Sequence, residues 1–280
     1  MSLIGTHVSV AGGVWLAPER GDSLGCESIQ IFTKNQLQWL AAPLSDSACE
    51  RFMNAWRQSR ISKIVAHSSY LLNLASEGET RTRSLAALAD EIRRCEQLGI
   101  DELVLHPGSH LGEGIGPGRA LVAEGLKQVI DKTGSSRTRI LLETMSGQGN
   151  TLGSSLEELA WIIESLDDNS RLGVCLDTCH LFAGGYELRG RVSYERLVRS
   201  VERLFGIGRV GCWHLNDSKK DMGSHLDRHQ HIGEGQIGVE FFSCIVSDPR
   251  WGDTPCLLET PKEGSGDEGN LALLRKLRGF

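Results

Sequence analysis

The sequence predicts an α/β protein built as a single (β/α)8, or TIM, barrel. Three observations lead to this prediction: short apolar runs alternate with helical patterns, eight such runs are present, and six of the eight end on a histidine, aspartate or glutamate. Parallel strands that are buried on both faces read as continuous apolar runs, and in a barrel their C-terminal ends meet at one face. We therefore expect six side chains of metal-ligand type to surround one bowl.

The eight expected strands follow one another along the chain. They are Leu3 to Val8, Ser28 to Phe32, Ile64 to His67, Leu103 to His106, Ile140 to Glu143, Val174 to Asp177, Val210 to His214 and Cys256 to Glu259. Between them, apolar residues from Leu85 to Cys95 recur at helical spacing, and Gly99 is placed to end that helix. Ser155 and Glu158 form a possible capping box at the start of another helix. Because strands and helices alternate and the strands number eight, we expect a closed parallel barrel rather than an open sheet.

No linker or change of composition divides the chain. We therefore expect residues 1–280 to form one catalytic domain, which is a length that suits a barrel. The polar, glycine-rich segment from Asn216 to Ile237 follows the seventh strand, and we expect it to be an active-site loop.

Composition excludes some classes of protein and leaves others open. No stretch of about eighteen apolar residues is present, so we expect no membrane span, and no basic segment with an apolar core stands at the N-terminus, so we expect no export signal. The eight cysteines include no C-x-x-C pair, which favours reduced thiols in a cytoplasmic protein. The formal net charge of −6 neither favours nor excludes nucleic acid, because bound divalent cations would supply positive charge where a phosphate sits.

The six strand-end residues have the side chains of a metal site: His67, His106, Glu143, Asp177, His214 and Glu259. A single histidine at a strand end is usually structural, but six residues of this kind at corresponding positions favour metal binding. Histidine and carboxylate without thiolate suit Zn2+, Mn2+ or Fe2+ better than a structural zinc site, which usually has cysteine ligands. A carboxylate can bridge two ions, and two neighbouring ions can activate a water and clamp a phosphoryl group.

Two clusters outside the strand ends extend this set. His180 lies three residues beyond Asp177, and Asp227 and His229 lie in the long polar segment. Taken singly they could be ordinary loop residues, but together they could hold a third ion. His7, at the end of the first strand, is expected to support the site or contact a phosphate rather than bind a metal. No role is assigned to the remaining nearby histidines, which are His110, His225 and His231.

Motifs along nearly the whole chain resemble those of the endonuclease IV family of apurinic/apyrimidinic endonucleases. They are Gly5-Thr-His-Val-Ser with Ala11-Gly-Gly, Phe32-Thr-Lys-Asn35, His67-Ser-Ser-Tyr70 with Asn73-Leu74, His106-Pro-Gly-Ser109, Glu143-Thr with Gly147-Gln-Gly149, Gly173-Val-Cys-Leu-Asp-Thr-Cys-His180, His214-Leu-Asn-Asp-Ser-Lys219, Asp227-Arg-His229 with Gly233-Glu-Gly235, and Leu258-Glu-Thr260. The Asp-Thr-Cys-His segment and the Asp-Arg-His segment with its Gly-Glu-Gly are specific signals. All nine metal positions of the family pattern carry the expected residue types.

The resemblance implies a trinuclear zinc site with three Zn2+ ions per chain, for which Mn2+ could substitute in part. By position, His67, His106 and Glu143 would bind one ion, and Glu143, Asp177, His214 and Glu259 a second, which makes Glu143 the bridging and catalytic carboxylate. His180, Asp227 and His229 would bind the third. A hydroxide held between the first two ions would be the nucleophile, and the third ion would stabilise the departing 3′ oxygen. The implied reaction is hydrolysis of the phosphodiester bond 5′ to an abasic site, which leaves a 3′-hydroxyl, with removal of blocked 3′ ends as a further activity.

The resemblance also implies that loops around the bowl bind double-stranded DNA that contains abasic sites or blocked 3′ ends. The expected DNA-binding residues are Lys34, Asn35, Gln36, Gln38, Tyr70 and Leu71, with Lys219, Lys220 and Arg228 as candidate phosphate contacts. In the family such loops enter the minor groove and push out the abasic nucleotide, which costs least where a base is already missing. Leu37 and Leu40 stand where a basic side chain is often found in similar proteins, and this departure bears on DNA affinity rather than on the chemistry. Since all the ligands come from one chain, we expect a monomer.

Two other functions remain open at this stage. A metal-dependent sugar isomerase or epimerase on a related barrel would also place carboxylates and histidines at strand ends. Such an enzyme needs two metals at most, so the cluster of His180, Asp227 and His229 would have no purpose in it. A non-catalytic protein that binds abasic sites would keep Tyr70 and the loops but could lose metal ligands, and none is lost here.

Overall fold

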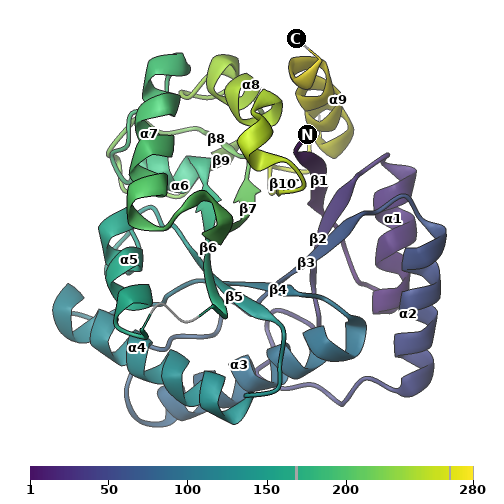
Figure 1. The fold of residues 1–280 in the computed structure, drawn as a ribbon, viewed down its shortest axis with the longest axis vertical. Coiled ribbons are helices and arrows are strands. Elements are labelled where there is room, and N and C mark those ends of the chain that lie inside the picture. Colours follow the sequence, from purple (N-terminus) through teal and green to yellow (C-terminus); the bar gives the residue numbers. More distant parts are fainter. Residues whose placement is uncertain (168–169, 265, 280) are drawn as a thin grey trace.

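The protein is described by a computed structural model that covers residues 1–167, 170–264 and 266–279. Within these ranges eight parallel strands form a closed barrel in the order β1-β10-β7-β6-β5-β4-β3-β2 (Figure 1). The barrel strands are β1 (Leu3–His7), β2 (Ser28–Phe32), β3 (Lys63–His67), β4 (Glu102–Leu105), β5 (Arg139–Glu143), β6 (Leu172–Asp177), β7 (Val210–His214) and β10 (Pro255–Leu258). The predicted (β/α)8 barrel is therefore confirmed.

Helices surround the barrel on its outside (Figure 1). They are α1 (Ala17–Ser23), α2 (Asp46–Gln58), α3 (Gly78–Leu98), α4 (Ile115–Lys132), α5 (Leu156–Glu164), α7 (Gly190–Leu204), α8 (Val239–Ser247) and α9 (Gly266–Arg278). The short helix α6 (Thr178–Ala183) follows β6 directly and lies at the C-terminal end of the barrel instead. Short 3-10 helices occupy Val14–Leu16, Ile207–Arg209 and Pro249–Trp251.

The inside of the barrel is a packed core. The side chains that fill it are Val65, Val104, Leu141, Cys175, Cys212 and Leu257, and all six are buried. The barrel closes where β1 pairs with β10 on one side and with β2 on the other. Gly5 makes the second pairing possible, because a Cβ at this position would lie 1.7 Å from the carbonyl oxygen of Ser28. Since apolar side chains occupy the interior, polar chemistry is confined to the ends of the strands.

Three strand ends differ from the prediction by one residue. β4 ends at Leu105 and β10 ends at Leu258, so His106 and Glu259 lie just beyond their strands, and β1 ends at His7 rather than at Val8. Leu105 and Leu258 are the last residues of their strands that pair with a neighbouring strand. An apolar run followed by a polar side chain therefore locates the end of a strand only to within about one residue. The strand itself ends where its backbone stops pairing with a neighbouring strand, not where the apolar run stops.

The predicted helix boundaries are largely confirmed. α3 ends at Leu98, and Gly99 follows it in the left-handed conformation with φ of 69°. The hydroxyl of Ser155 caps α5 by accepting a hydrogen bond from the backbone N–H of Glu158 at 3.2 Å. The second half of the expected capping box is absent, because the Glu158 carboxylate accepts from the N–H of Gly153, at 2.7 Å, instead of from that of Ser155.

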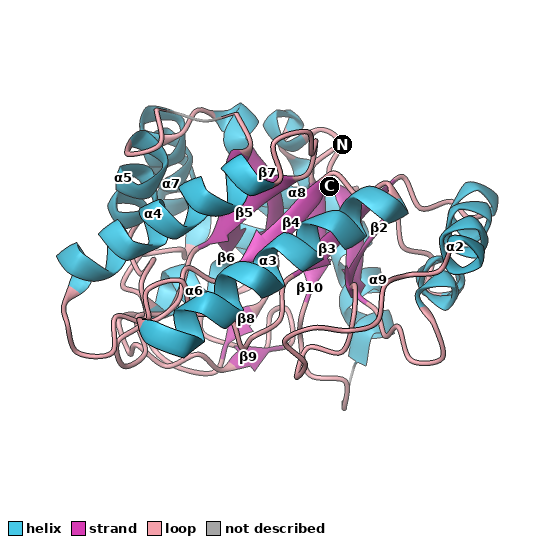
Figure 2. Cartoon of the chain, turned by 90° about the horizontal axis from the view of Figure 1, so that it is seen from below, coloured by secondary structure: helices cyan, strands magenta, loops and turns pink. Residues whose placement is uncertain are grey.

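The segment after β7 is not wholly a loop. β8 (Asp217–Ser218) and β9 (His229–Gln230) pair antiparallel in a short hairpin. Figure 2 shows this hairpin at the lower edge of the molecule, on the side away from the N-terminus. The predicted active-site loop therefore contains two short strands, which the sequence did not indicate because strands so short leave no periodic signal.

All eight cysteines are free thiols, as predicted. Seven of them are buried and Cys49 is half-buried. No helix in the described part of the chain is long and apolar enough to cross a membrane.

Candidate metal centre

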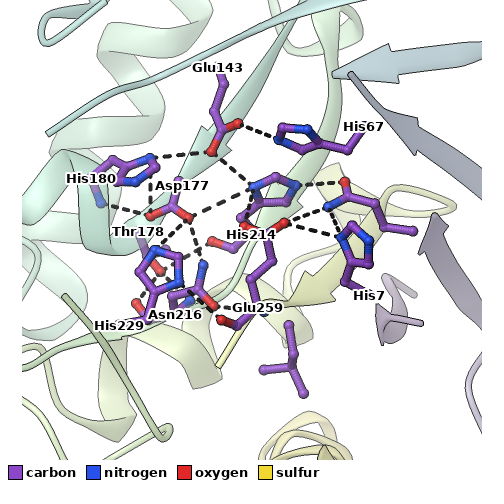
Figure 3. A network of polar contacts seen from close by, with 12 residues as sticks. His7, His67, Glu143, Asp177, Thr178, His180, His214, Asn216, His229 and Glu259 are labelled. Carbon is purple, nitrogen blue, oxygen red and sulfur yellow. Dashed lines mark hydrogen bonds and ion pairs between the residues drawn. The ribbon is translucent and has the colours of Figure 1, made fainter. Parts of the chain in front are cut away.

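The nine side chains predicted as metal ligands meet at the C-terminal end of the barrel, and Figure 3 shows most of them. They come from elements that are far apart in the sequence: His67, Glu143, Asp177 and His214 end β3, β5, β6 and β7, His106 and Glu259 follow β4 and β10, His180 lies in α6, Asp227 in the segment between β8 and β9, and His229 in β9. Closure of the barrel is what brings them together.

Glu143 joins two groups of potential ligands. Its Oε2 lies 3.0 Å from His106 Nε2 and 3.3 Å from His67 Nε2, and its Oε1 lies 3.1 Å from His214 Nδ1. His214 Nδ1 is also 3.3 Å from Glu259 Oε2. The ligand atoms of His67, His106 and Glu143 all lie within 4.8 Å of one another, as do those of Glu143, Asp177, His214 and Glu259. One buried carboxylate thus faces two potential ion positions.

Asp227 joins a third group. Its Oδ2 lies 3.2 Å from His180 Nε2 and its Oδ1 lies 3.1 Å from His229 Nε2. The ligand atoms of these three residues also lie within 4.8 Å of one another. Asp177 Oδ2, which belongs to the second group, is 3.8 Å from His229 Nε2, so the second and third groups adjoin.

The histidine rings are oriented as metal ligands usually are. His180 Nδ1 lies 2.8 Å from the carbonyl oxygen of Thr144, and His229 Nδ1 lies 3.1 Å from that of Glu259. A ring nitrogen that bonds to a carbonyl carries the proton, so the other nitrogen can accept a metal. The Nε2 atoms of His180 and His229 are buried and make no hydrogen bond within the described residues. Buried polar atoms without a hydrogen bond are uncommon, and two such nitrogens that lie 3.2 and 3.1 Å from the oxygens of one carboxylate, Asp227, fit a cation between them.

Charge is concentrated at these residues, where four carboxylates face five imidazoles. Burial would raise the pKa of Glu143, but His214 and His106 hold that pKa well below its usual range. Burial would lower the pKa of His214, whereas Glu259 and Glu143 raise it well above its usual value. The imidazoles and the carboxylates therefore stabilise each other's charged forms, and a metal that binds here would take the place of protons on the imidazoles.

Gln30 and Asn216 orient several of these side chains, and neither was predicted to belong to the site. Gln30 Oε1 lies 2.8 Å from His214 Nε2, and Gln30 Nε2 donates to Glu259 Oε1 at 2.6 Å. Asn216 Nδ2 donates to Asp177 Oδ2 at 2.6 Å. The one signal for Gln30 was a glutamine inside the apolar run of β2, and Asn216 stood in a matching motif without a role.

His7 lies beside the site, where the sequence placed it. Its Nδ1 is 3.0 Å from Gln30 Nε2 and 3.5 Å from Glu259 Oε1. Burial lowers the pKa of His7, although the hydrogen bond and charge of Glu259 oppose that change. His7 is therefore placed to support Glu259.

Asp217 holds the segment that carries the third group. Its buried carboxylate accepts hydrogen bonds from the backbone N–H groups of Ser218, Gly233, Gly235 and Ile237, at distances from 2.8 to 3.1 Å. A Cβ on Gly235 would lie 2.5 Å from an oxygen of this carboxylate, so only glycine fits there. These bonds fold the chain after β9 back onto β8 and so fix the position of His229.

Most residues predicted to bind DNA lie in two loops beside the candidate ligands, one after β2 and one after β3. Asn35 and Gln38 are exposed, whereas Gln36 and Leu71 are half-buried. Tyr70 is 52% exposed, and its ring centre lies 5.5 Å from that of His106. The side chains of Leu37 and Leu40, which depart from the family pattern, face solvent with 69% and 59% of their surface exposed.

Lys34 differs from the other predicted DNA-binding residues. Its side chain is buried, and its ammonium group forms an ion pair with Glu91 of α3. A charge that is buried and neutralised in this way is not offered to a phosphate. The structure therefore does not support the predicted DNA contact of Lys34, whereas Lys219, Lys220 and Arg228 are not buried.

A cavity of about 430 Å³ opens beside the ligand groups, and its walls include Tyr70, Gln148 and Arg228.

The three histidines without a predicted role form hydrogen bonds to residues outside the ligand groups. His110 Nδ1 accepts from the N–H of Gly114 at 3.0 Å, His225 Nδ1 lies 3.0 Å from the carbonyl oxygen of Ser146, and His231 Nδ1 lies 2.9 Å from Asn270 Nδ2.

Known proteins resemble this chain in both fold and sequence. Residues 19–278 match a family model described as a xylose isomerase-like TIM barrel. A probable endonuclease 4 of Chloroflexus aurantiacus is 47% identical over 280 residues, which is 99% of this chain and 98% of that protein. The crystal structure of endonuclease IV from Thermus thermophilus matches with a TM-score of 0.88 and 35% identity over 98% of both chains. That of a 3-keto-D-glucoside 4-epimerase from E. coli matches over 100% of both chains with a TM-score of 0.69 at 15% identity, which shows a shared fold alone.

Proposed function

Because the chain belongs to the endonuclease IV family, we propose that it is a DNA repair endonuclease that acts at abasic sites. The proposed reaction is hydrolysis of the phosphodiester bond on the 5′ side of the abasic site in double-stranded DNA, which leaves a 3′-hydroxyl. Removal of blocked 3′ ends is part of the proposal, because such ends also carry a phosphate ester on the 3′ oxygen that hydrolysis would free.

The observation that carries this proposal is that three groups of potential ligands adjoin one another and that the first two share a carboxylate. Glu143 faces two groups, and Asp177 of the second group lies 3.8 Å from His229 of the third. Adjacent divalent ions are the arrangement by which proteins stabilise both the attacking and the departing oxygen of a phosphoryl centre.

The residues present fit three Zn2+ ions, with Mn2+ as a partial substitute, since the nine ligands are imidazoles and carboxylates. When bound, such ions lower the pKa of a water that attacks phosphorus and place positive charge beside the leaving oxygen. Their six positive charges would exceed the four negative charges of Glu143, Asp177, Asp227 and Glu259 by two, which leaves net attraction for a phosphate.

The chain itself supplies alignment. Glu143 would fix the spacing of the first two positions, since each of its oxygens serves one group. Gln30 would hold His214 and Glu259 in one orientation, because its amide bonds to both. Arg228 and Tyr70 would contact the backbone and the sugar of the substrate, and their position in the wall of the cavity supports this role.

We propose in addition that residues 1–280 act as one catalytic domain and that the protein works as a monomer in the cytoplasm. The nine candidate ligands come from one chain, which supports the first two proposals. Eight free thiols suit a reducing compartment, which supports the third.

The test is an incision assay with a duplex that contains a single synthetic abasic site. The zinc-loaded protein should cut the damaged strand once, on the 5′ side of the lesion, and a DNA polymerase should extend the new 3′-hydroxyl. An intact duplex of the same sequence and protein treated with a chelator are the matched controls. Tight binding without cleavage would favour a non-catalytic binder, and epimerisation of a sugar without cleavage would favour an enzyme like the epimerases; either result would refute the proposal.

A further inference from the structure

Two buried charged residues connect the two loops that lie beside the candidate metal centre. Lys34, in the loop after β2, pairs with Glu91 of α3, and only 6% of Lys34 and 1% of Glu91 are exposed. α3 packs against β4 on the outside of the barrel (Figure 2). Glu91 therefore reaches from a rigid helix to the rim of the site.

The Glu91 carboxylate binds both loops. Its Oε2 accepts from the hydroxyl of Thr33 at 2.7 Å, which anchors the loop after β2. Its Oε1 accepts from the backbone N–H of Ser69 at 3.1 Å, which anchors the loop after β3. A carboxylate that accepts several hydrogen bonds and pairs with a lysine is compensated for its burial.

Ser69 adds a direct bond between the loops. Its hydroxyl donates to the carbonyl oxygen of Gln36 at 2.6 Å and accepts from the N–H of Leu71 at 3.2 Å. Between Ser69 and Leu71 stands Tyr70, whose ring lies 5.3 Å from that of His67. The position of the first loop is thus linked through Ser69 to the aromatic side chain that borders the candidate ligands.

We propose that Glu91, whose buried negative charge Lys34 balances, is a positioning residue that holds residues 33–42 and 68–72 together as one unit on α3. Lys34 then acts on DNA binding through the placement of Tyr70, Asn35 and Gln38, and not by touching a phosphate. The part of this inference that concerns DNA rests on the proposed function, whereas the coupling of the two loops does not.

Arg94 provides a matched control on the same helix. It is also buried and charged, but its guanidinium donates to the carbonyl oxygens of Ala41 and Ala42, the first of these at 3.0 Å, and pairs with Asp90 at 2.9 Å. It therefore anchors only the far end of the loop after β2. A change at Arg94 should loosen one loop, and a change at Lys34 should loosen both.

Amide hydrogen exchange tests the coupling without DNA. In Lys34→Met the buried Glu91 loses its counter-charge, so the amides of Ser69, Leu71 and Leu72 should exchange faster together with those of Leu37 and Gln38. In Arg94→Met only residues 33–42 should exchange faster. The double variant Lys34→Met/Glu91→Gln should regain protection in both loops, since a glutamine can still accept from Ser69 and donate to Thr33. Unchanged exchange at Ser69, Leu71 and Leu72 in Lys34→Met, or no recovery in the double variant, would overturn the proposal.

The salt dependence of binding to an abasic duplex separates the two possible roles of Lys34. Loss of a phosphate contact lowers the slope of log K against log salt concentration by about 0.9. We expect Lys34→Met to weaken binding by about tenfold at every salt concentration, so that the slope stays that of the wild type while the metal content is kept. The double variant should bind within about threefold of wild type with the same slope. A slope lower by about 0.9 in the double variant would show that Lys34 touches DNA and would overturn the inference. Failure of the wild type to prefer the abasic duplex would instead refute the proposed function and leave the exchange result standing.

Discussion

Replacing Glu143 by glutamine removes the carboxylate that the first two groups of candidate ligands share. The change is nearly isosteric, and the side chain is fully buried, so the surface that meets DNA is unaltered. The amide keeps one oxygen but puts an NH2 group, which cannot bind a cation, at the place of the other. Glu143 Oε2 lies 3.0 Å from His106 and Oε1 lies 3.1 Å from His214. The change therefore removes the negative charge that both groups share, and one of the two groups also loses a candidate ligand atom.

The size of the effect follows from this geometry. A metal that stabilises transition-state charge contributes several kcal/mol, and a loss of about 4 kcal/mol corresponds to about a thousandfold in rate. We therefore expect single-turnover incision at an abasic site to fall by about a thousandfold or more in Glu143→Gln, with the affinity for the abasic duplex within about threefold of wild type. The assay compares the incision rate at saturating protein with the dissociation constant from fluorescence anisotropy.

Glu102→Gln is the matched control. Glu102 begins β4, at the opposite end of the barrel from His106. Its replacement by glutamine is the same carboxylate-to-amide change, but it lies far from the candidate ligands. Its incision rate should equal that of the wild type. Incision by Glu143→Gln within about tenfold of wild type would mean that the lost interaction is worth less than about 1.4 kcal/mol, which is too little for a bridging ligand.

Four further outcomes follow from the same geometry. His229→Ala should bind one ion fewer than wild type by elemental analysis, since His180 and Asp227 alone leave the third group incomplete; an unchanged count would exclude that group as an ion site. Asp217→Asn should lower the melting temperature, because four backbone N–H groups lose a charged acceptor and bonds of this kind contribute about 1.5–3 kcal/mol. It should lower the metal content at the same time. A normal metal content would show that the hairpin of β8 and β9 does not position the third group. Leu37→Arg should bind abasic DNA more tightly and steepen the slope of log K against log salt concentration by about 0.9, because it adds one phosphate contact. An unchanged slope would show that this loop lies away from the DNA backbone. Removal of metal by a chelator should lower the melting temperature, and zinc should restore it. An ion present at about a hundredfold its Kd adds about 2.7 kcal/mol to the free energy of unfolding. A melting temperature that does not change on chelation would argue against bound metal ions.

The fold and the places where the candidate ligands gather could be predicted because local sequence records them. A buried parallel strand is an apolar run whatever its neighbours are, and a ligand at its end is visible as a polar residue that stops the run, as at His67 and Asp177. The same reasoning misplaced the boundaries at His106 and Glu259 by one residue, since backbone pairing ends before the ligand is reached.

Residues whose role depends on distant partners could not be predicted from local sequence. The resemblance to the endonuclease IV family implied that Lys34 contacts DNA, but its partner Glu91 lies 57 residues further on in a helix. Gln30 stood inside an apolar run, and only closure of the barrel brings it to His214, 184 residues away. Neither pairing leaves a periodic signal, because each depends on tertiary contact rather than on secondary structure.

The proposed mechanism requires three ions to act together on one phosphodiester bond. The measurement that tests it is the rate of incision at a single abasic site as a function of the zinc bound per chain, starting from metal-free protein. Incision should reach its full rate only when three zinc ions are bound. Full incision with one or two ions bound, or none with three, would contradict it.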